Sequence, residues 1–165
     1  MLTELLDEAV LAEAMLVSTC NRVEVYCVPT SDATTDAVKQ ALERQLLTQR
    51  GIPLSLFHDN GYVLTGQSAV EHIMRVTSSL DSMVVGEPQI LGQVKAAMRL
   101  AREANAIGPL LGRVTDRALR AAKAVRTRTD IGRESVSIGS VAVDLARRIF
   151  DDISDCRVLI VGAGK

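Results

Sequence analysis

The sequence predicts an α/β fold in which a small, mostly antiparallel sheet is covered by several helices. Two short runs, at residues 15–18 and 23–28, flank a polar turn, and the second run alternates with the two-residue period of a strand. Later segments repeat apolar residues every three or four positions, as amphipathic helices do. An apolar run at residues 158–161 then leads directly into a glycine-rich turn.

The composition limits the class of protein. The 165 residues are 47% hydrophobic and 24% charged with a net charge of -1, which suits one core, or one domain and part of another. Two tyrosines and two phenylalanines are too few for a surface that stacks single-stranded bases. Three cysteines without paired or zinc-ligand spacing, no signal peptide and no membrane-length apolar run predict a cytoplasmic protein without a metal site.

The first half of the chain is predicted to mix helices with strands. Residues 2–12 are expected to form a helix whose beginning is missing, and the strands at 15–18 and 23–28 follow. Thr34, Thr35 and Asp36 offer N-caps for a helix that reaches Gly51. Residues 52–66 are expected to be irregular, with a turn at 60–61 and a short strand at 62–64.

The second half is predicted to be helical until the final strand. Helices are expected from about 67 to 78, from the 86–89 interruption to about 104, after the break at 108–109, and from Ser135 or Ser137 onward. The residues predicted to face inward are Val38, Leu42 and Leu46; Val70, Ile73, Met74 and Thr77; Val94, Ala97, Met98 and Ala101; Val114, Ala118, Ala121 and Val125; and Ile138, Ala142, Leu145 and Ile149.

The turn between the two strands carries the most informative motif, Ser-Thr-Cys-Asn-Arg-Val at residues 18–23. Cys20 lies where apolar residues give way to polar ones, and Arg22 follows two positions later. A thiol on a turn beside a fixed positive charge is one way to obtain a reactive thiolate. The alternative is an ordinary core residue, because free cysteine is among the most buried residue types.

The C-terminal residues resemble the start of a dinucleotide-binding unit. A buried β-branched strand that runs into Gly-x-Gly begins such βαβ units, because the glycines let the backbone approach a pyrophosphate. Here the chain stops at Lys165, before a third glycine or an acidic ribose ligand. We therefore expect a fragment of a longer protein with a nucleotide domain after residue 156. A P-loop fits poorly, because Leu159 stands where its first glycine would be.

Polar residues in the central block suit contacts with a ligand. Ser82, Glu87, Gln89 and Gln93 lie in or beside a loop that contains glycines. Glu87 can accept from an amine, and the glutamines can serve an amine or a carboxylate. The alternative is a capped loop that leads into a helix, with Glu87 near its N-terminus. His72 also has two possible roles, as a packed, hydrogen-bonded residue or as a catalytic one.

Basic residues gather in one later segment. Residues 113–128 contain six arginines and lysines against one acid, Asp116. Such a face can meet nucleic-acid phosphates, or it can simply be solvated.

Three separated blocks resemble one family, glutamyl-tRNA reductase. They are residues 18–26, 86–95, and 125–132 with 135–146, and together they span nearly the whole chain in the right order. The resemblance implies that the Cys20 thiolate attacks the ester joining glutamate to its tRNA and leaves a thioester. It further implies NADPH-dependent reduction to glutamate-1-semialdehyde, the first step of tetrapyrrole (porphyrin and haem) biosynthesis by the five-carbon pathway.

The resemblance also implies residue roles. Thr19, Cys20, Asn21 and Arg22 would surround the reacting carbonyl, with Arg22 on the glutamate side-chain carboxylate. His72 matches a histidine near the family's active site. The other positions that match the family's glutamate-binding residues are Ser82, Glu87, Pro88, Gln89 and Gln93, and those that match the NADPH loop are Gly162, Ala163, Gly164 and Lys165.

The same resemblance suggests a division of the chain and a set of partners. Residues 1–132 would form the catalytic, glutamate-binding domain without its N-terminal strand, 133–156 a linking helix and connection, and 157–165 the first strand and glycine turn of a Rossmann-type NADPH domain. Ser79 stands where the family usually has glycine. Expected partners are glutamyl-tRNA(Glu), a second subunit through a missing C-terminal domain, and an aminomutase that receives the product.

Two other functions compete with this one. A non-catalytic RNA-binding or scaffold module would use the 113–128 face and bury Cys20. A cysteine hydrolase would use Cys20 and His72, and it leaves the terminal glycine turn unexplained. The isolated chain is not expected to be a competent reductase.

Overall fold

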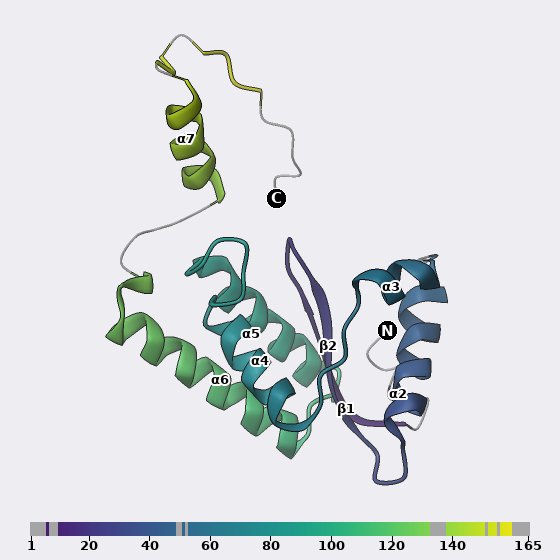
Figure 1. Cartoon of the computed structure of the whole chain (residues 1–165). Coiled ribbons are helices and arrows are strands. Elements are labelled where there is room, and N and C mark those ends of the chain that lie inside the picture. The colour runs from purple at the N-terminus through teal and green to yellow at the C-terminus, as the bar shows by residue number, and fades with distance from the viewer. Residues whose placement is uncertain are drawn as a thin grey trace.

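The computed structural model describes residues 6, 10–48, 51, 53–132, 138–150, 152–154 and 156–159. Its sheet is a single antiparallel hairpin of β1 (Leu11–Ser18) and β2 (Val23–Pro29), in which Ser18 pairs with Val23 and Leu11 with Pro29 (Figure 1). The predicted hairpin is confirmed.

The first strand begins four residues earlier than expected. Leu11 and Ala12, assigned to a helix over 2–12, belong to β1, and the rest of that predicted helix lies outside the described residues except Leu6 and Val10. The error has a physical cause. β1 is buried on both faces, so its apolar residues run together instead of alternating.

Helices cover both faces of the hairpin. On one face lie α4 (Gly66–Thr77), α5 (Pro88–Glu103) and α6 (Pro109–Arg128), and on the other lies α2 (Thr35–Leu42) (Figure 1). The main core joins β1 to the three-helix layer, and a smaller one joins it to α2. The main core consists of Met15, Val17, Ile73, Val76, Ile90, Val94, Ala97, Met98, Ala101, Ala106, Leu111 and Ala118.

The segment after β2 is more helical than predicted. Thr34 caps α2 through a hydrogen bond that its hydroxyl accepts from Ala37 N at 3.2 Å, and a π-helical turn, Glu43–Thr48, follows. Residues expected to be irregular instead form α3 (Leu54–Asn60), and the described residues 62–64 form no strand. A helix of seven residues is too short to show a clear apolar period.

The predicted inward faces are confirmed for α5 and for Val38 and Leu42 of α2, and they differ in part for α4 and α6. The side chain of Leu46 lies outside the described part of the chain. All four predicted α5 residues are buried. In α4, Val76 replaces the exposed Val70. In α6 the buried residues are Leu111, Thr115, Ala118 and Ala122. Of the four predicted positions, Ala118 is buried and Val114 packs against the core, whereas Ala121 and Val125 are only partly buried. Thr115 tolerates burial because its hydroxyl donates to the Leu111 carbonyl at 2.8 Å.

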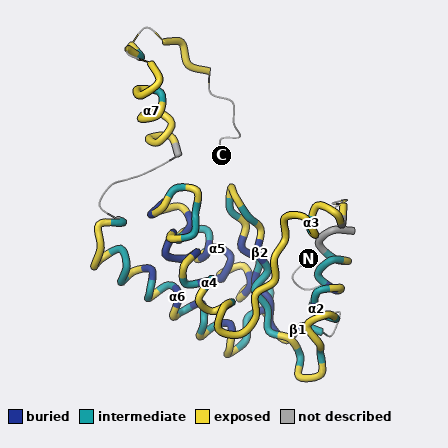
Figure 2. The backbone as a smooth tube through the Cα atoms, viewed as in Figure 1, coloured by how far each residue is buried: buried dark blue, intermediate teal, exposed yellow. Residues whose placement is uncertain are grey.

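The C-terminal elements differ most from expectation. α7 (Ile138–Ile149) stands away from the other helices, and its predicted inward residues Leu145 and Ile149 are 56% and 65% exposed (Figures 1 and 2). Residues 157–159 form no strand, and the rest of that predicted strand, with the glycine turn, lies outside the described residues. A strand needs a neighbour to pair with, and no described residue pairs with this segment.

None of the helices in the described ranges has the length and apolar character needed to cross a bilayer.

Glu13 joins the sheet to α6. Its carboxylate accepts hydrogen bonds from Leu110 N at 3.0 Å and Leu111 N at 2.7 Å, the unpaired amides of the first turn. A Cβ on Gly108 would lie 2.6 Å from this carboxylate, so any larger residue there would push Glu13 away from the helix N-terminus.

We expect Glu13→Ala to lower the free energy of unfolding by about 2 kcal/mol, because it removes two charge-assisted bonds at a helix N-terminus. Urea unfolding measures the loss. Glu103→Ala, which removes an exposed pair with Arg99, is the control and should cost less than about 0.5 kcal/mol. Equal stability of Glu13→Ala and wild type would contradict the role assigned to Glu13.

Candidate active site

The hairpin turn places Cys20 in solvent. Thr19 N donates to the Arg22 carbonyl at 2.9 Å, and the Thr19 hydroxyl accepts from Asn21 N at 3.2 Å and Arg22 N at 3.1 Å. These bonds close a tight turn around residue 20, and the Cys20 side chain is exposed. The alternative of an ordinary core cysteine is therefore wrong.

A pocket unites the turn with the central block, about 60 residues later in the chain. It is lined by Thr19, Cys20, Asn21, Arg22, Val76, Asp81, Ser82, Met83, Glu87 and Ile90. Of the remaining predicted site residues, Pro88 and Gln89 are exposed on α5 and do not line it. Gln93 is partly buried, and its amide oxygen has no hydrogen-bond donor among the described residues.

Glu87 is a buried carboxylate that faces this pocket. It occupies the N-cap position of α5, yet its side chain makes no capping hydrogen bond. The residue is only 3% exposed and lines the pocket. An acceptor held in this way suits a ligand that brings its own donor, such as an ammonium group.

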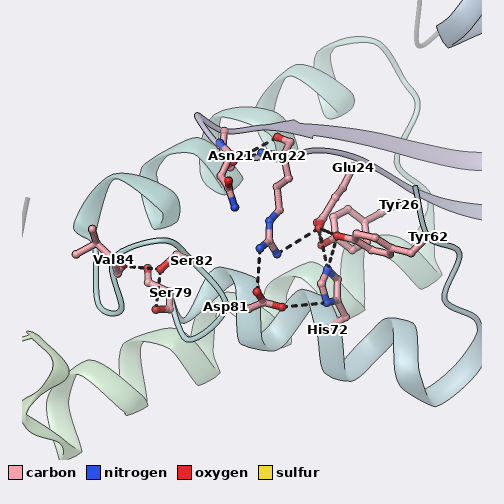
Figure 3. A network of polar contacts seen from close by, with 11 residues as sticks. Asn21, Arg22, Glu24, Tyr26, Tyr62, His72, Ser79, Asp81, Ser82 and Val84 are labelled. Carbon is pink, nitrogen blue, oxygen red and sulfur yellow. Dashed lines mark hydrogen bonds and ion pairs between the residues drawn. The ribbon is translucent and has the colours of Figure 1, made fainter. Parts of the chain in front are cut away.

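The loop before α5 is held by its own backbone. The Ser82 hydroxyl lies 2.6 Å from the Val84 carbonyl and 3.1 Å from that of Ser79, so it can donate within the loop (Figure 3). Arg126 of α6 donates from one nitrogen to the carbonyls of Gly86 and Glu87, both at 3.0 Å. α6 therefore fixes the loop that brings Glu87 to the pocket.

Two loop positions have positive φ. Gly86 has φ of +86°, and a Cβ there would lie 2.6 Å from the Ile131 carbonyl oxygen, so only glycine fits. Ser79 has φ of +58°, which explains why glycine is the expected residue at this position. A residue with a side chain loses conformational energy at positive φ, and the Ser79 hydroxyl offsets part of this loss by donating to the Glu87 carbonyl at 2.7 Å.

Arg22 is held between two carboxylates. Its Nη2 donates to Asp81 Oδ1 at 2.8 Å, and its Nη1 lies 3.5 Å from Glu24 Oε1 without a hydrogen bond (Figure 3). The hydrogen bond with Asp81 raises the pKa of Arg22, and it lowers the pKa of Asp81. Arg22 is thus a permanently charged group that still has donors to offer.

Glu24 is the centre of the network. Its carboxylate contacts His72 Nε2 at 2.8 Å and accepts hydrogen bonds from the hydroxyls of Tyr26 and Tyr62 (Figure 3). Burial alone would raise the pKa of Glu24, but these hydrogen bonds together lower it below 4.5. Burial and the bond to Glu24 raise the pKa of Tyr62 to about 12. Glu24 is therefore a buried carboxylate ion.

His72 belongs to this network and does not line the Cys20 pocket. Besides Glu24, its Nε2 lies 3.2 Å from the Tyr62 hydroxyl, and its Nδ1 lies 3.6 Å from Asp81 Oδ2. The rings of Tyr62 and His72 meet edge to face, with their centroids 5.5 Å apart. His72 thus contacts both carboxylates that face Arg22.

Comparisons with known proteins identify the family of this chain. A family model described as "Glutamyl-tRNAGlu reductase, N-terminal domain" matches residues 1–129. The chain belongs to the glutamyl-tRNA reductase family.

Individual relatives support the same assignment. A glutamyl-tRNA reductase of Aquifex aeolicus is 47% identical over 96% of this chain and 37% of its own length, and one of Desulfatibacillum aliphaticivorans is 47% identical over 94% and 35%. The solved structure of glutamyl-tRNA reductase from Methanopyrus kandleri matches with a TM-score of 0.65 and 36% identity, over 89% of this chain and 33% of that one. The chain spans about a third of the length of these reductases.

Several polar residues of this candidate site were not predicted from the sequence, among them Asp81, Glu24 and Tyr62. Asp81 lines the pocket, while Glu24 and Tyr62 complete the network around His72. One signal was available for Glu24, since an acid in an otherwise apolar strand needs a partner if it is buried. No local signal pointed to Tyr62, which reaches Glu24 from an extended segment.

The predicted NADPH-loop residues of the family, Gly162 to Lys165, lie outside the described residues. Across the described ranges no three histidine, cysteine or acidic residues come together as a metal site.

Proposed function

We propose that this chain supplies the acyl-transfer site of a reductase acting on glutamyl-tRNA(Glu), with Cys20 as the nucleophile. One observation carries the proposal. The exposed Cys20 shares a pocket with a permanent cation, Arg22, and a buried carboxylate, Glu87, that makes no helix-capping bond. A glutamyl ester has an α-ammonium and a side-chain carboxylate near its reacting carbonyl, so this pocket has complementary charges for both.

The proposed step exchanges one acyl bond for another. The Cys20 thiol gives its proton to solvent and forms a C–S bond to the ester carbonyl carbon, the C–O bond to the ribose breaks, and the ribose oxygen leaves as a hydroxyl after taking a proton from solvent. Arg22 binds the glutamate side-chain carboxylate through its free donors, and Glu87 accepts from the α-ammonium. Thr19, Asn21 and Ser82 line the same space, and Pro88, Gln89 and Gln93 remain proposed glutamate-binding positions beside it.

The proposed role of His72 is orientation. Its contacts with Glu24 and Asp81 hold the two carboxylates that face Arg22. A cysteine hydrolase would need a histidine beside the Cys20 sulfur, and His72 does not line that pocket. The geometry therefore favours acyl transfer without a Cys–His pair.

The remaining steps are proposed from the family. Hydride is what NADPH supplies when bound, and the product of the whole protein would be glutamate-1-semialdehyde for cytoplasmic tetrapyrrole biosynthesis. A homodimer and transfer of product to an aminomutase belong to the same proposal. The residues assigned to NADPH, Gly162, Ala163, Gly164 and Lys165, lie outside the described part of the chain, so the chemistry assigned to the described site ends at the thioester.

We expect a covalent glutamyl group on Cys20 after incubation with glutamyl-tRNA(Glu), because the proposed binding of glutamate by Arg22 and Glu87 brings the reacting carbonyl to the exposed Cys20 sulfur. Mass spectrometry of the intact chain and of its peptides locates the adduct, and hydroxylamine should remove it. Uncharged tRNA with free glutamate is the control. A chain that stays unmodified, or carries the adduct on Cys27 or Cys156, would refute the proposed function.

A further inference from the structure

A stripe of exposed cations runs along α6. It comprises Arg113, Arg117, Arg120, Lys123 and Arg128, and we call it the α6 basic stripe. At 100° per residue Arg113, Arg117 and Arg120 lie on one side of the helix, and the whole stripe extends about 22 Å along the axis. α6 forms an outer edge of the helical layer, so the stripe faces away from the core (Figures 1 and 2).

The charge of this stripe is not cancelled locally. No acidic residue in the described ranges forms an ion pair with its five members. The single acid within 113–128 is Asp116, and Arg102 of α5 pairs with it at 3.4 Å. The chain as a whole has a net charge of -1, so this density of free positive charge is confined to one helix.

The stripe also has a fixed relation to the Cys20 pocket. Arg126, at the C-terminal end of α6, holds the carbonyls of Gly86 and Glu87, and Glu87 lines the pocket. The N-terminal end of α6 is held by Glu13 near the start of β1, at the opposite end of the hairpin from Cys20. The C-terminal end of α6 therefore lies beside the pocket loop, and the stripe runs along the same helix on the side turned away from Arg126.

We infer that the α6 basic stripe binds the phosphodiester backbone of the RNA whose 3′ end enters the Cys20 pocket. This inference rests on the proposed function, which places an RNA ester at that pocket. An RNA strand carries one negative charge per nucleotide, so a stripe of this length can contact several phosphates in succession. The scarcity of exposed aromatic residues favours backbone contacts over base stacking.

The test compares two triple variants with the same loss of charge. Arg113→Gln/Arg117→Gln/Arg120→Gln removes three members of the stripe, and Lys39→Gln/Arg147→Gln/Arg148→Gln removes three cations from α2 and α7. Glutamine has nearly the helix propensity of arginine, so both should fold, which circular dichroism checks. Binding of a tRNA(Glu) transcript to each chain is measured by fluorescence anisotropy between about 50 and 200 mM salt.

The stripe variant should bind tRNA on the order of 10-fold or more weakly, and the slope of log affinity against log salt should fall by about two to three. The control should keep the wild-type slope. Equal losses of tRNA affinity in both variants, or an unchanged salt slope in the stripe variant, would overturn the inference. The stripe would then be a solvated surface or a contact for an acidic protein.

A second measurement separates this inference from the proposed function. At saturating glutamyl-tRNA(Glu), the stripe variant should acylate Cys20 at the wild-type rate, because its pocket is intact. Loss of tRNA affinity in a protein whose wild type never becomes acylated would retain the RNA-binding stripe and remove the proposed function. If Cys20 is acylated normally and the stripe variant binds tRNA with unchanged affinity, the proposed function stands and the RNA-binding stripe is rejected.

Discussion

Replacing Cys20 by serine is expected to lower the rate of glutamyl transfer from glutamyl-tRNA(Glu) to the protein by at least about 10³-fold, the scale on which removal of a nucleophile acts. A serine hydroxyl is a much weaker nucleophile than a thiol unless a histidine activates it, and His72 does not line this pocket. Acid-quenched samples with labelled glutamate measure the transfer. The exposed position predicts a change in unfolding free energy within about 0.5 kcal/mol, so lost activity would not reflect lost folding.

The other two cysteines are matched controls. Cys27 faces the small core beside α2, and burial raises the pKa of its thiol, so Cys27→Ser should leave transfer unchanged. Cys156 is exposed like Cys20 but lies outside the pocket, so Cys156→Ser tests whether exposure alone is enough. Full activity in Cys20→Ser, or lost activity in Cys156→Ser, would reject Cys20 as the nucleophile.

Replacing Glu24 by glutamine is expected to lower the free energy of unfolding by about 3 kcal/mol. The change leaves Arg22 with Asp81 as its only carboxylate partner and takes the Glu24 charge from His72 Nε2, and breaking a buried ion pair from one side costs about 3–5 kcal/mol. Urea unfolding near neutral pH measures the loss. Glu71→Gln, in an exposed pair with Arg75, is the control and should cost less than about 0.5 kcal/mol.

The same variant has an expected pH signature. Folding lowers the pKa of Glu24 below 4.5, so its contribution to stability is present above that value and is lost as pH falls through the folded pKa. Arg22, Tyr26, Tyr62 and His72 face Glu24, and Asp81 completes the same network. The difference in unfolding free energy between wild type and Glu24→Gln should therefore shrink below about pH 4.5. A difference that stays constant with pH would mean that the charge of Glu24 contributes nothing.

Local patterns were enough for the hairpin and for the helices that cover it. The alternation after Arg22 and the apolar periods of α4 and α5 arise from contacts that each element makes with one layer, so they are visible in the sequence. They were not enough for α3, which is short, or for α7, whose apolar side chains remain exposed in the described structure. The prediction of a final strand failed over 157–159 because pairing is a property of the sheet and not of one segment.

The sequence by itself determined the family, the turn that carries Cys20 and the loop that contains Ser82 and Glu87, because each is a contiguous motif. Only the tertiary structure decided that these two motifs line one pocket, and that Arg22 is held by Asp81 and Glu24. The ion network draws single residues from the hairpin, an extended segment, α4 and the following loop. Charges that meet across such sequence distances leave no periodic pattern, since their pairing depends on packing and on the low dielectric of the site.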